Sequence, residues 1–264
     1  MFAARLVGPL ALISAVLLPL APAVARQEVA PDRPDITDSA QTISPGGFQL
    51  ESGIEYGRTR IGGSPAERRL SLDTTLRIGL ADRIELEVDA EPVVWLRTDR
   101  EYLSRGDLTL LLKYRFFGSD DREAGLALAL RPFVKLPTAD APIGSERTDF
   151  GLQLLLSQPL PADFSVDVNA GIAANGQRQP DGFLLQALAS ASLSYEVIPG
   201  LSPFVELFFQ TKDQWEGRNL LGLTAGVVYL LNESVAVDTA VRTSLMGRGP
   251  DWSVTAGVSV RWGK

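Results

Sequence analysis

An alternation of apolar and polar residues with a period of two runs through most of this 264-residue chain. It begins in the stretch 48–56, FQLESGIEY, and recurs to the end of the sequence. Successive side chains of a β-strand point to opposite faces, so the pattern predicts strands with one apolar and one polar face. We expect an all-β fold of about twelve strands. The predicted strands span 48–58, 68–80, 84–95, 106–117, 124–136, 148–159, 163–174, 182–197, 202–212, 219–230, 234–246 and 252–262.

Residues 1–25 have the three parts of a secretory signal peptide. Arg5 supplies the positive charge, residues 10–20 form the apolar core, and residues 23–25 read Ala-Val-Ala, which fits the rule for cleavage. An uncleaved membrane anchor is the alternative, but three prolines and the short apolar run argue against a spanning helix. We therefore expect an exported chain whose leader is removed.

The predicted connections alternate between short and long. Short turns centre near residues 82, 120, 161, 199 and 232, and long loops near 62, 100, 142, 178, 215 and 249. Short periplasmic turns that alternate with longer external loops are typical of bacterial outer-membrane barrels, and an even strand number leaves both termini in the periplasm. The pattern predicts a transmembrane antiparallel up-and-down β-barrel, monomeric, in contact with outer-membrane lipid and inserted by the outer-membrane assembly machinery.

Aromatic residues gather at the two ends of the apolar face, as in the aromatic belts of membrane barrels. One group is Tyr114, Phe116, Tyr195, Tyr229 and Trp262, and the other is Trp95, Trp215 and Trp252. The chain departs from the usual aromatic C-terminus, because Gly263 and Lys264 follow Trp262. A soluble secreted β-sandwich or lipocalin-like binding protein is the alternative fold, but about twelve strands would leave its interior poorly filled.

Two motifs carry a resemblance to a known family. The first is RPDITDS at 33–39 followed by PGGFQLESG at 45–53, and the second is RPFVKLPT at 131–138. They resemble the bacterial outer-membrane family called "Putative MetA-pathway of phenol degradation", also described as transporters. The resemblance implies an outer-membrane β-barrel, loosely assigned to the transport of hydrophobic or aromatic compounds, and it brings no catalytic residues with it.

The absence of cysteine and histidine excludes several kinds of active site. Neither a Ser-His-Asp triad, nor a Cys-His pair, nor a histidine-ligated zinc can be built from this chain. Glu85 and Glu87 share a face as paired acids might, but such pairs are common on any wet strand. We predict no enzyme activity, no cofactor and no metal site.

The charge of the chain argues against nucleic acid as a partner. Removal of Arg5 with the leader from the 25 basic residues leaves 24 against 32 acidic ones, a net charge of −8. A mature chain with this excess of acidic residues has no basic patch to neutralise phosphates.

Charged residues on the polar face are the candidate lumen residues. They form either a constriction that filters solutes or ion pairs that fill and rigidify the barrel. These residues are Arg77, Glu85, Glu87, Asp89, Glu91, Lys113, Arg115, Arg131 and Lys135. The turn at 81–83 predicts Arg77 opposite Glu85 or Glu87. The next turn predicts Lys113 beside Ala129 or Arg131, and Asp107 near Lys135. Negative charge would then gather on one wall and positive charge on the other, giving a transverse field.

Two further features face the same lumen. Phe204 and Phe208 face inward by parity, and they form either an apolar track for aromatic solutes or a simple filling of the lumen. Residues 26–46 are rich in proline and turn formers, and they form either a solvated periplasmic tail or a plug or latch at the barrel mouth. In the second case the plug residues are Arg33, Asp35 and Asp38.

The domain plan is therefore a signal peptide at 1–25, a periplasmic segment at 26–46 and a barrel at 47–264. The predicted function is passive uptake or efflux of a small solute, aromatic or hydrophobic, through an outer-membrane channel. A structural or adhesive barrel that conducts nothing is the main alternative, and the soluble binding protein is the remote one.

Overall fold

The computed structural model describes residues 28–60, 66–119, 125–247 and 249–263. The predicted signal peptide at 1–25 lies outside these ranges, as does most of the turn centred near residue 120. Within the described ranges, no helix is long and apolar enough to cross a membrane.

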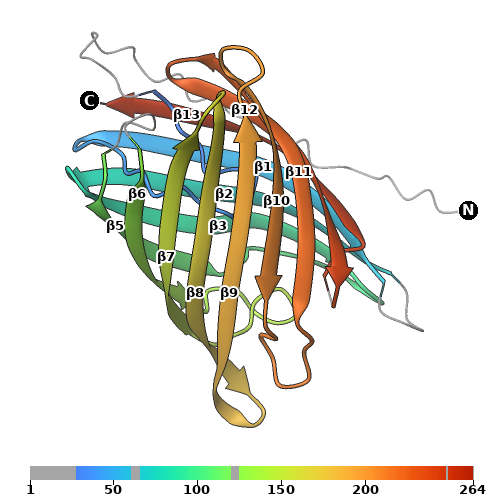
Figure 1. Ribbon diagram of the computed structural model, residues 1–264. Helices are drawn as coiled ribbons and strands as arrows, with labels where there is room; N and C mark the ends of the chain where they lie inside the picture. The colour runs from blue at the N-terminus through green and yellow to red at the C-terminus, as the bar shows by residue number, and fades with distance from the viewer. Residues whose placement is uncertain (1–27, 61–65, 120–124, 248, 264) are drawn as a thin grey trace, which may run out of the picture.

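Thirteen strands in the described part of the chain form one antiparallel sheet. They are β1 (Gly47–Thr59), β2 (Glu67–Ala81), β3 (Ile84–Arg97), β4 (Glu101–Ser104), β5 (Leu108–Phe117), β6 (Ala127–Leu136), β7 (Asp149–Leu160), β8 (Phe164–Arg178), β9 (Asp181–Tyr195), β10 (Leu201–Gln210), β11 (Leu220–Asn232), β12 (Val235–Met246) and β13 (Trp252–Gly263). Because β1 pairs with both β2 and β13, and β2 also pairs with β3, all of them except β4 close into a barrel (Figure 1). The predicted all-β barrel of about twelve strands is confirmed.

One predicted connection contains an additional strand, and another is wrong. The loop near residue 100 contains β4, a short strand that extends β3 as a hairpin and is too brief and exposed for periodicity to reveal. The expected long loop near residue 178 is a tight turn, because β8 continues to Arg178 and β9 begins at Asp181. Inward-facing Asn175 and Gln177 stabilise this extension, since they hydrogen-bond to the Gln186 side chain and to the carbonyl of Asp213.

The wall of the barrel is apolar on the outside and polar on the inside. Large hydrophobic side chains such as Leu154, Val205 and Val258 are exposed on the outer face. Glu85 and Lys113, in contrast, are 0% exposed on the inner face. Soluble proteins bury their apolar residues and expose their charged ones, so this inverted arrangement requires lipid outside the wall. The structure therefore contradicts the soluble alternative and confirms the predicted inside and outside faces.

Aromatic pairs stand near both ends of the wall. Phe48 stacks on Trp262 with ring centroids 5.9 Å apart where β1 meets β13, at the end where the short turns lie. Tyr56 and Trp252 meet at 5.7 Å towards the other end. Such pairs join neighbouring strands across the sheet. We call the barrel end near Phe48 and Trp262 the short-turn end, and the end near Tyr56 and Trp252 the long-loop end.

One β-bulge changes the phase of alternation in β3. Asp73 of β2 stands opposite two residues of β3, Glu91 and Pro92, because the pairing shifts between Leu72 and Thr74. A bulge adds one residue to a strand and so exchanges its two faces beyond that point. Val94 is consequently an inward residue with 0% exposure.

Candidate functional site

Residues 28–46 lie inside the barrel, and many of their side chains are buried there (Figure 1). Val29, Thr42 and Ile43 are each no more than 2% exposed. The segment runs against opposite parts of the wall, since Val29 donates to the carbonyl of Glu233 and Ala40 donates to the Ser157 hydroxyl. We call residues 28–46 the lumen segment.

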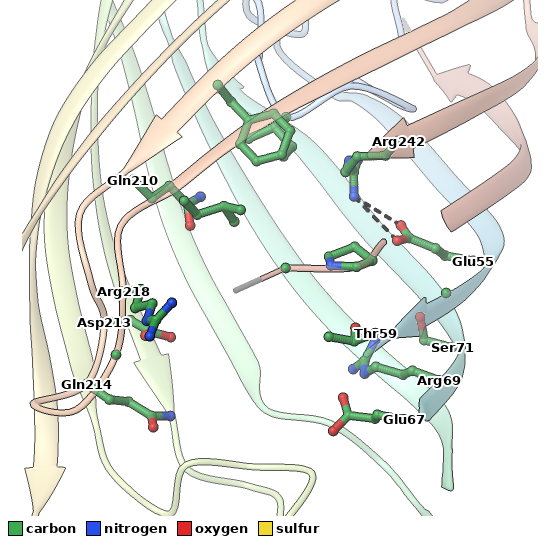
Figure 2. Close-up of a pocket in the computed structure, with 17 residues that line it drawn as sticks. Glu55, Thr59, Glu67, Arg69, Ser71, Gln210, Asp213, Gln214, Arg218 and Arg242 are labelled. Atoms are coloured by element: carbon green, nitrogen blue, oxygen red, sulfur yellow. Dashed lines mark hydrogen bonds and ion pairs between the residues drawn. The ribbon is translucent and has the colours of Figure 1, made fainter. Parts of the chain in front are cut away.

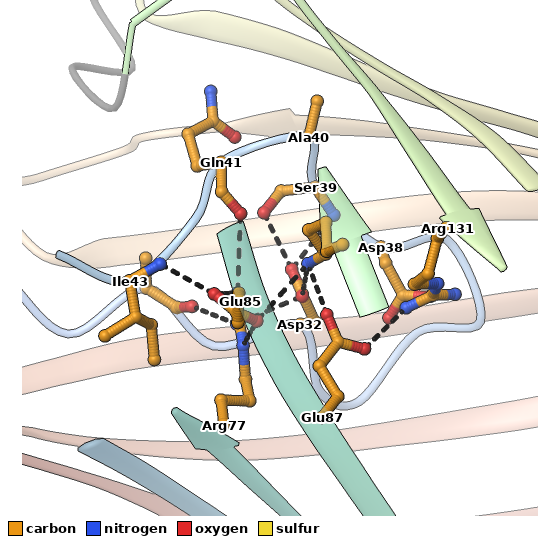
Figure 3. A network of polar contacts seen from close by, with 12 residues as sticks. Asp32, Asp38, Ser39, Ala40, Gln41, Ile43, Arg77, Glu85, Glu87 and Arg131 are labelled. Atoms are coloured by element: carbon orange, nitrogen blue, oxygen red, sulfur yellow. Dashed lines mark hydrogen bonds and ion pairs between the residues drawn. The ribbon is translucent and has the colours of Figure 1, made fainter. Parts of the chain in front are cut away.

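Arg77 of β2 is the centre of a buried charge network between the wall and the lumen segment (Figure 3). Its Nε donates to Glu85 at 2.7 Å, and its Nη1 lies 3.0 Å from Asp32 and 3.1 Å from Glu51. Lys113 adds a second cation, 2.9 Å from Asp32. Charges removed from water require such pairing, and here one partner comes from the lumen segment.

Arg131 of β6 extends the network along the wall, one strand beyond Lys113 of β5. It forms ion pairs with Glu87 at 3.1 Å and with Asp38 of the lumen segment, and its guanidinium also donates to Gln153. Glu87 in turn lies 3.0 Å from Lys113. The expected like-charged neighbours on β5 and β6 therefore receive counter-charges from β3 and from the lumen segment.

The predicted register around these charges is confirmed. Arg77 stands opposite Glu87, and the pairings Leu111–Phe133 and Tyr114–Leu130 bring Lys113 and Arg131 to neighbouring positions. The sequence did not reveal that Asp32 and Asp38 of the lumen segment join these cations. Their carboxylates offset the positive wall and so reduce the transverse field expected from the strands alone.

Wall carboxylates also bind the backbone of the lumen segment. Glu206 of β10 is fully buried, and its Oε1 accepts hydrogen bonds from Ile36 N, Thr37 N and Thr37 Oγ1 at 2.6 to 2.8 Å. Glu85 accepts from Ile43 N at 2.6 Å, and Glu51 accepts from Arg33 N at 3.1 Å. Hydrogen bonds to an ionised acceptor are stronger than neutral ones, so they anchor an otherwise irregular backbone.

The carboxyls of the lumen segment titrate differently. Burial acts to raise the pKa of Asp32, but the charges of Arg77 and Lys113 hold it well below its usual range. Burial raises the pKa of Asp38 to about 6, although Arg131 lowers it. Burial also raises the pKa of Asp35 well above its usual value, and the neighbouring charge of Glu206 adds to the effect.

The other predicted lumen residues lie apart from this network. Glu91 pairs with Arg69, and Lys135 pairs with Asp149 and, at 3.5 Å, with Asp107, which was the predicted partner. Arg115 donates to the backbone carbonyls of Asp82 and Gly118 near the short-turn end. Asp89 is half-buried beside Glu87 and lines the inner cavity described below.

Arg33 and the two phenylalanines line further parts of the lumen. Arg33 of the lumen segment donates to Thr255 at 2.8 Å and pairs with Asp238 at 3.4 Å. Phe204 and Phe208 are inward and buried, opposite Gly226 and Gly222 of β11. A Cβ on either glycine would overlap the facing ring, so the rings fill the space that the glycines leave.

The described residues enclose a rim cavity and an inner cavity within the lumen. The rim cavity, of about 530 Å³, lies towards the long-loop end (Figure 2). Its lining includes Glu55, Arg69, Phe208, Asp213, Arg218 and Arg242. The inner cavity, of about 260 Å³, lies among the charged residues of the lumen segment and of β1 to β3. In the described residues, no group of three or more acidic side chains is arranged to hold a metal ion.

The family model described as "Putative MetA-pathway of phenol degradation" matches residues 31–262. The chain belongs to this family. The match begins within the lumen segment and ends at the last strand, so the family pattern includes both the barrel and the residues inside it. No match was found among curated protein sequences.

Solved structures of outer-membrane proteins share the fold. An outer membrane channel from Pseudomonas putida F1 aligns over 89% of this chain and 100% of its own, with 17% identity and a TM-score of 0.67. The NanC porin aligns over 81% of this chain and 98% of its own, with 9% identity and a TM-score of 0.53. The KdgM porin covers the same shares, with 10% identity and a TM-score of 0.52. At these identities the likeness establishes the fold alone, that of an outer-membrane β-barrel.

Proposed function

We propose that this protein is a passive outer-membrane channel for small molecules. The observation that carries the proposal is a cavity of about 530 Å³ with charged walls, inside a closed barrel whose outer face is apolar. A barrel needs an apolar outer face to sit in lipid, but it needs a roomy polar interior only if something polar enters. The outer membrane channel and the two porins of similar fold support this function.

The export, assembly and orientation of the protein follow from an outer-membrane location. Residues 1–25 direct export and are removed, the assembly machinery inserts the barrel as a monomer, and both termini lie in the periplasm. Gly47 and Gly263 pair at the short-turn end, which supports a common side for the two ends of the barrel. In outer-membrane barrels the short turns are periplasmic. The rim cavity then faces the outside of the cell.

The lumen segment restricts passage as a plug. Its partners support this role, because Asp32, Arg33 and Asp38 are ion-paired to different strands around the barrel. A solute that crosses the membrane must move past these groups or displace them. The charged residues of β2, β3, β5 and β6 then act on the solute together with the segment, as a filter.

The solute is a small compound with an aromatic or hydrophobic part. The family description links its members to phenol degradation, and Phe208 brings an aromatic ring to the wall of the rim cavity. The channels and porins of similar fold support transport over catalysis, and we propose no enzyme activity for this chain.

A structural barrel that conducts nothing is the second candidate. The observation that favours it is the tightness of the central network, where the side chains of Arg77 and Lys113 are 3% and 0% exposed. A solute cannot pass between these paired side chains while the ion pairs remain intact.

Planar-bilayer recording of the refolded full-length chain separates the two candidates. A channel gives discrete current steps across the bilayer. Heat-modifiable migration on detergent gels serves as the control that the inserted protein is a folded barrel. If the folded protein inserts but passes neither ions nor solutes, the channel function is contradicted and the structural role is favoured.

A further inference from the structure

One ion pair stands at the boundary between the two cavities. Glu55 of β1 and Arg242 of β12 line both the rim cavity and the inner cavity. Their closest atoms, Arg242 Nη1 and a Glu55 carboxylate oxygen, are 3.2 Å apart (Figure 2). The pair reaches over β13, which lies between the two strands in the sheet. A solute that moves from one cavity to the other therefore meets both charges.

This pair remains accessible, unlike the central network. The Arg242 and Glu55 side chains are 18% and 23% exposed, whereas those of Arg77 and Lys113 are almost fully enclosed. A molecule in the rim cavity can therefore reach the two charges without first breaking the central network.

The guanidinium of Arg242 is held in place from several sides. Its Nη2 donates to the carbonyl of Pro34 at 3.3 Å, and its Nε donates to Thr224 Oγ1 at 3.4 Å. Nη1 is the nitrogen that binds both carboxylate oxygens of Glu55. If Glu55 turns away, Arg242 stays anchored and presents Nη1 to the cavity as a hydrogen-bond donor.

Apolar groups lie beside the charges. The Phe208 ring centroid is 5.9 Å from the Arg242 guanidinium carbon. Ile36 of the lumen segment and Leu220 of β11 line the same cavity. At the Glu55–Arg242 pair, the rim cavity therefore places a cation, an anion and apolar side chains within the reach of one small molecule, and its other charged residues lie further along the wall.

We propose that the rim cavity binds a small zwitterion that carries a carboxylate, an ammonium group and an apolar side chain. The carboxylate takes Nη1 of Arg242, the ammonium group takes the Glu55 carboxylate, and the side chain lies against Phe208, Ile36 and Leu220. This inference rests on the proposed channel function and names the class of solute. No covalent step is involved.

The physical reason is the balance of charge when the pair opens. A zwitterion replaces both halves of the ion pair, so neither Arg242 nor Glu55 is left without a partner. A simple anion or cation satisfies one side chain and leaves the other charged and unpaired in a partly enclosed space, which costs free energy. An uncharged solute satisfies neither charge and leaves the pair closed.

Four probes with the same phenyl side chain test this class. L-phenylalanine is the zwitterion, 3-phenylpropionate lacks the ammonium group, 2-phenylethylamine lacks the carboxylate, and 3-phenylpropanamide is uncharged. Binding to the refolded full-length protein in detergent is measured by ligand-observed NMR titration, which does not require conduction. Interruption of the ion current in planar bilayers is measured with the same four compounds. Glu55→Gln and Arg242→Gln are the test variants, and Arg97→Gln, which alters an exposed pair with Glu101, is the matched control.

The site predicts tighter binding of L-phenylalanine than of each analogue by about tenfold or more, corresponding to at least one well-made charge interaction. Glu55→Gln and Arg242→Gln should each remove that preference, while Arg97→Gln keeps it. Equal binding of the four compounds to the wild-type protein would overturn the zwitterion site, as would tighter binding of 3-phenylpropionate, which would indicate an anion site. If the protein conducts ions but binds the four compounds equally, the zwitterion site is overturned and the proposed channel function stands. Preferential binding without current would overturn the channel and keep the site.

Discussion

The docking of the lumen segment should weaken as the pH rises, and Asp38 is the group that allows a magnitude. Burial raises the pKa of Asp38 from 3.8 to about 6, against Arg131, which faces it from β6. Lys113 also faces it, as do the carboxylates of Glu87 and Asp32. A carboxyl whose pKa is raised on docking favours the docked state below pH 3.8 and loses this contribution as the pH rises through about 6.

The difference between the undocked and docked pKa values of Asp38 sets how strongly docking depends on pH. The docking equilibrium should weaken about tenfold between about pH 5 and about pH 8 through Asp38 alone. Asp35, whose pKa is also raised, acts in the same direction. Asp32 has a lowered pKa, so its contribution is lost only as the pH falls below 3.8 and stays constant across this range.

The absence of native cysteine makes a thiol-labelling assay possible. Ser39→Cys is close to isosteric and places a thiol at a position that is 3% exposed, where a reagent reacts only after the segment leaves. Ser104→Cys on the exposed β4 corrects for the thiolate fraction at each pH. The corrected rate at position 39 should rise at least about tenfold from about pH 5 to about pH 8, because Asp35 adds to the contribution of Asp38. Asp38→Asn should reduce this rise by about tenfold and leave the part that comes from Asp35. An undiminished rise in that variant would refute the reasoning.

Three further predictions test the wall. Val258→Arg, on the lipid face of β13, should cost about 2–4 kcal/mol of barrel stability, as measured by urea unfolding in vesicles. Thr109→Arg, on the inner face, should cost much less, and equal costs would contradict the assigned inner and outer faces. Lys113→Met should cost about 3–5 kcal/mol, because it leaves Asp32 and its neighbouring carboxylates without one of their cations; an unchanged urea midpoint would contradict the network. Gly222→Ala should cost about 1–3 kcal/mol by crowding Phe208, and Phe208→Ala in the same chain should relieve it.

The barrel could be predicted from the sequence because lipid and water impose a simple rule on each strand. An outward position must be apolar and an inward one polar, so the alternation in each strand gives both the strand and its faces. The tight turn between β2 and β3 fixes their register, so the position of Arg77 opposite Glu87 followed as well. These features depend on residues close together in the chain.

The contents of the lumen could not be predicted in the same way. Asp32 meets Lys113 across 81 positions of sequence, and no periodicity indicates which strand an irregular segment will contact. The acceptor role of Glu206 and the Glu55–Arg242 pair depend on the curvature of the closed wall. Their only sequence signal is a charge on the polar face of a strand.

The space available at inward positions of the barrel could not be predicted from the sequence either. Ser259 lies on the polar face, where alternation alone predicts that an arginine is tolerated. In the structure the Ser259 side chain is fully buried, so an arginine has no space at this position. Burial at such positions depends on the lumen segment and on neighbouring strands, which alternation does not describe.

The central claim is that the lumen segment limits a path through a channel. Single-channel conductance of the full-length protein and of a variant that lacks residues 28–44 tests it most directly, with heat-modifiable migration as the check that both are folded barrels. We predict discrete current steps for the full-length protein and a clearly larger conductance for the variant, because the deletion removes the partners of Arg77, Lys113 and Arg131 from the lumen. Equal conductance of two folded proteins, or the absence of current in both, would contradict the account.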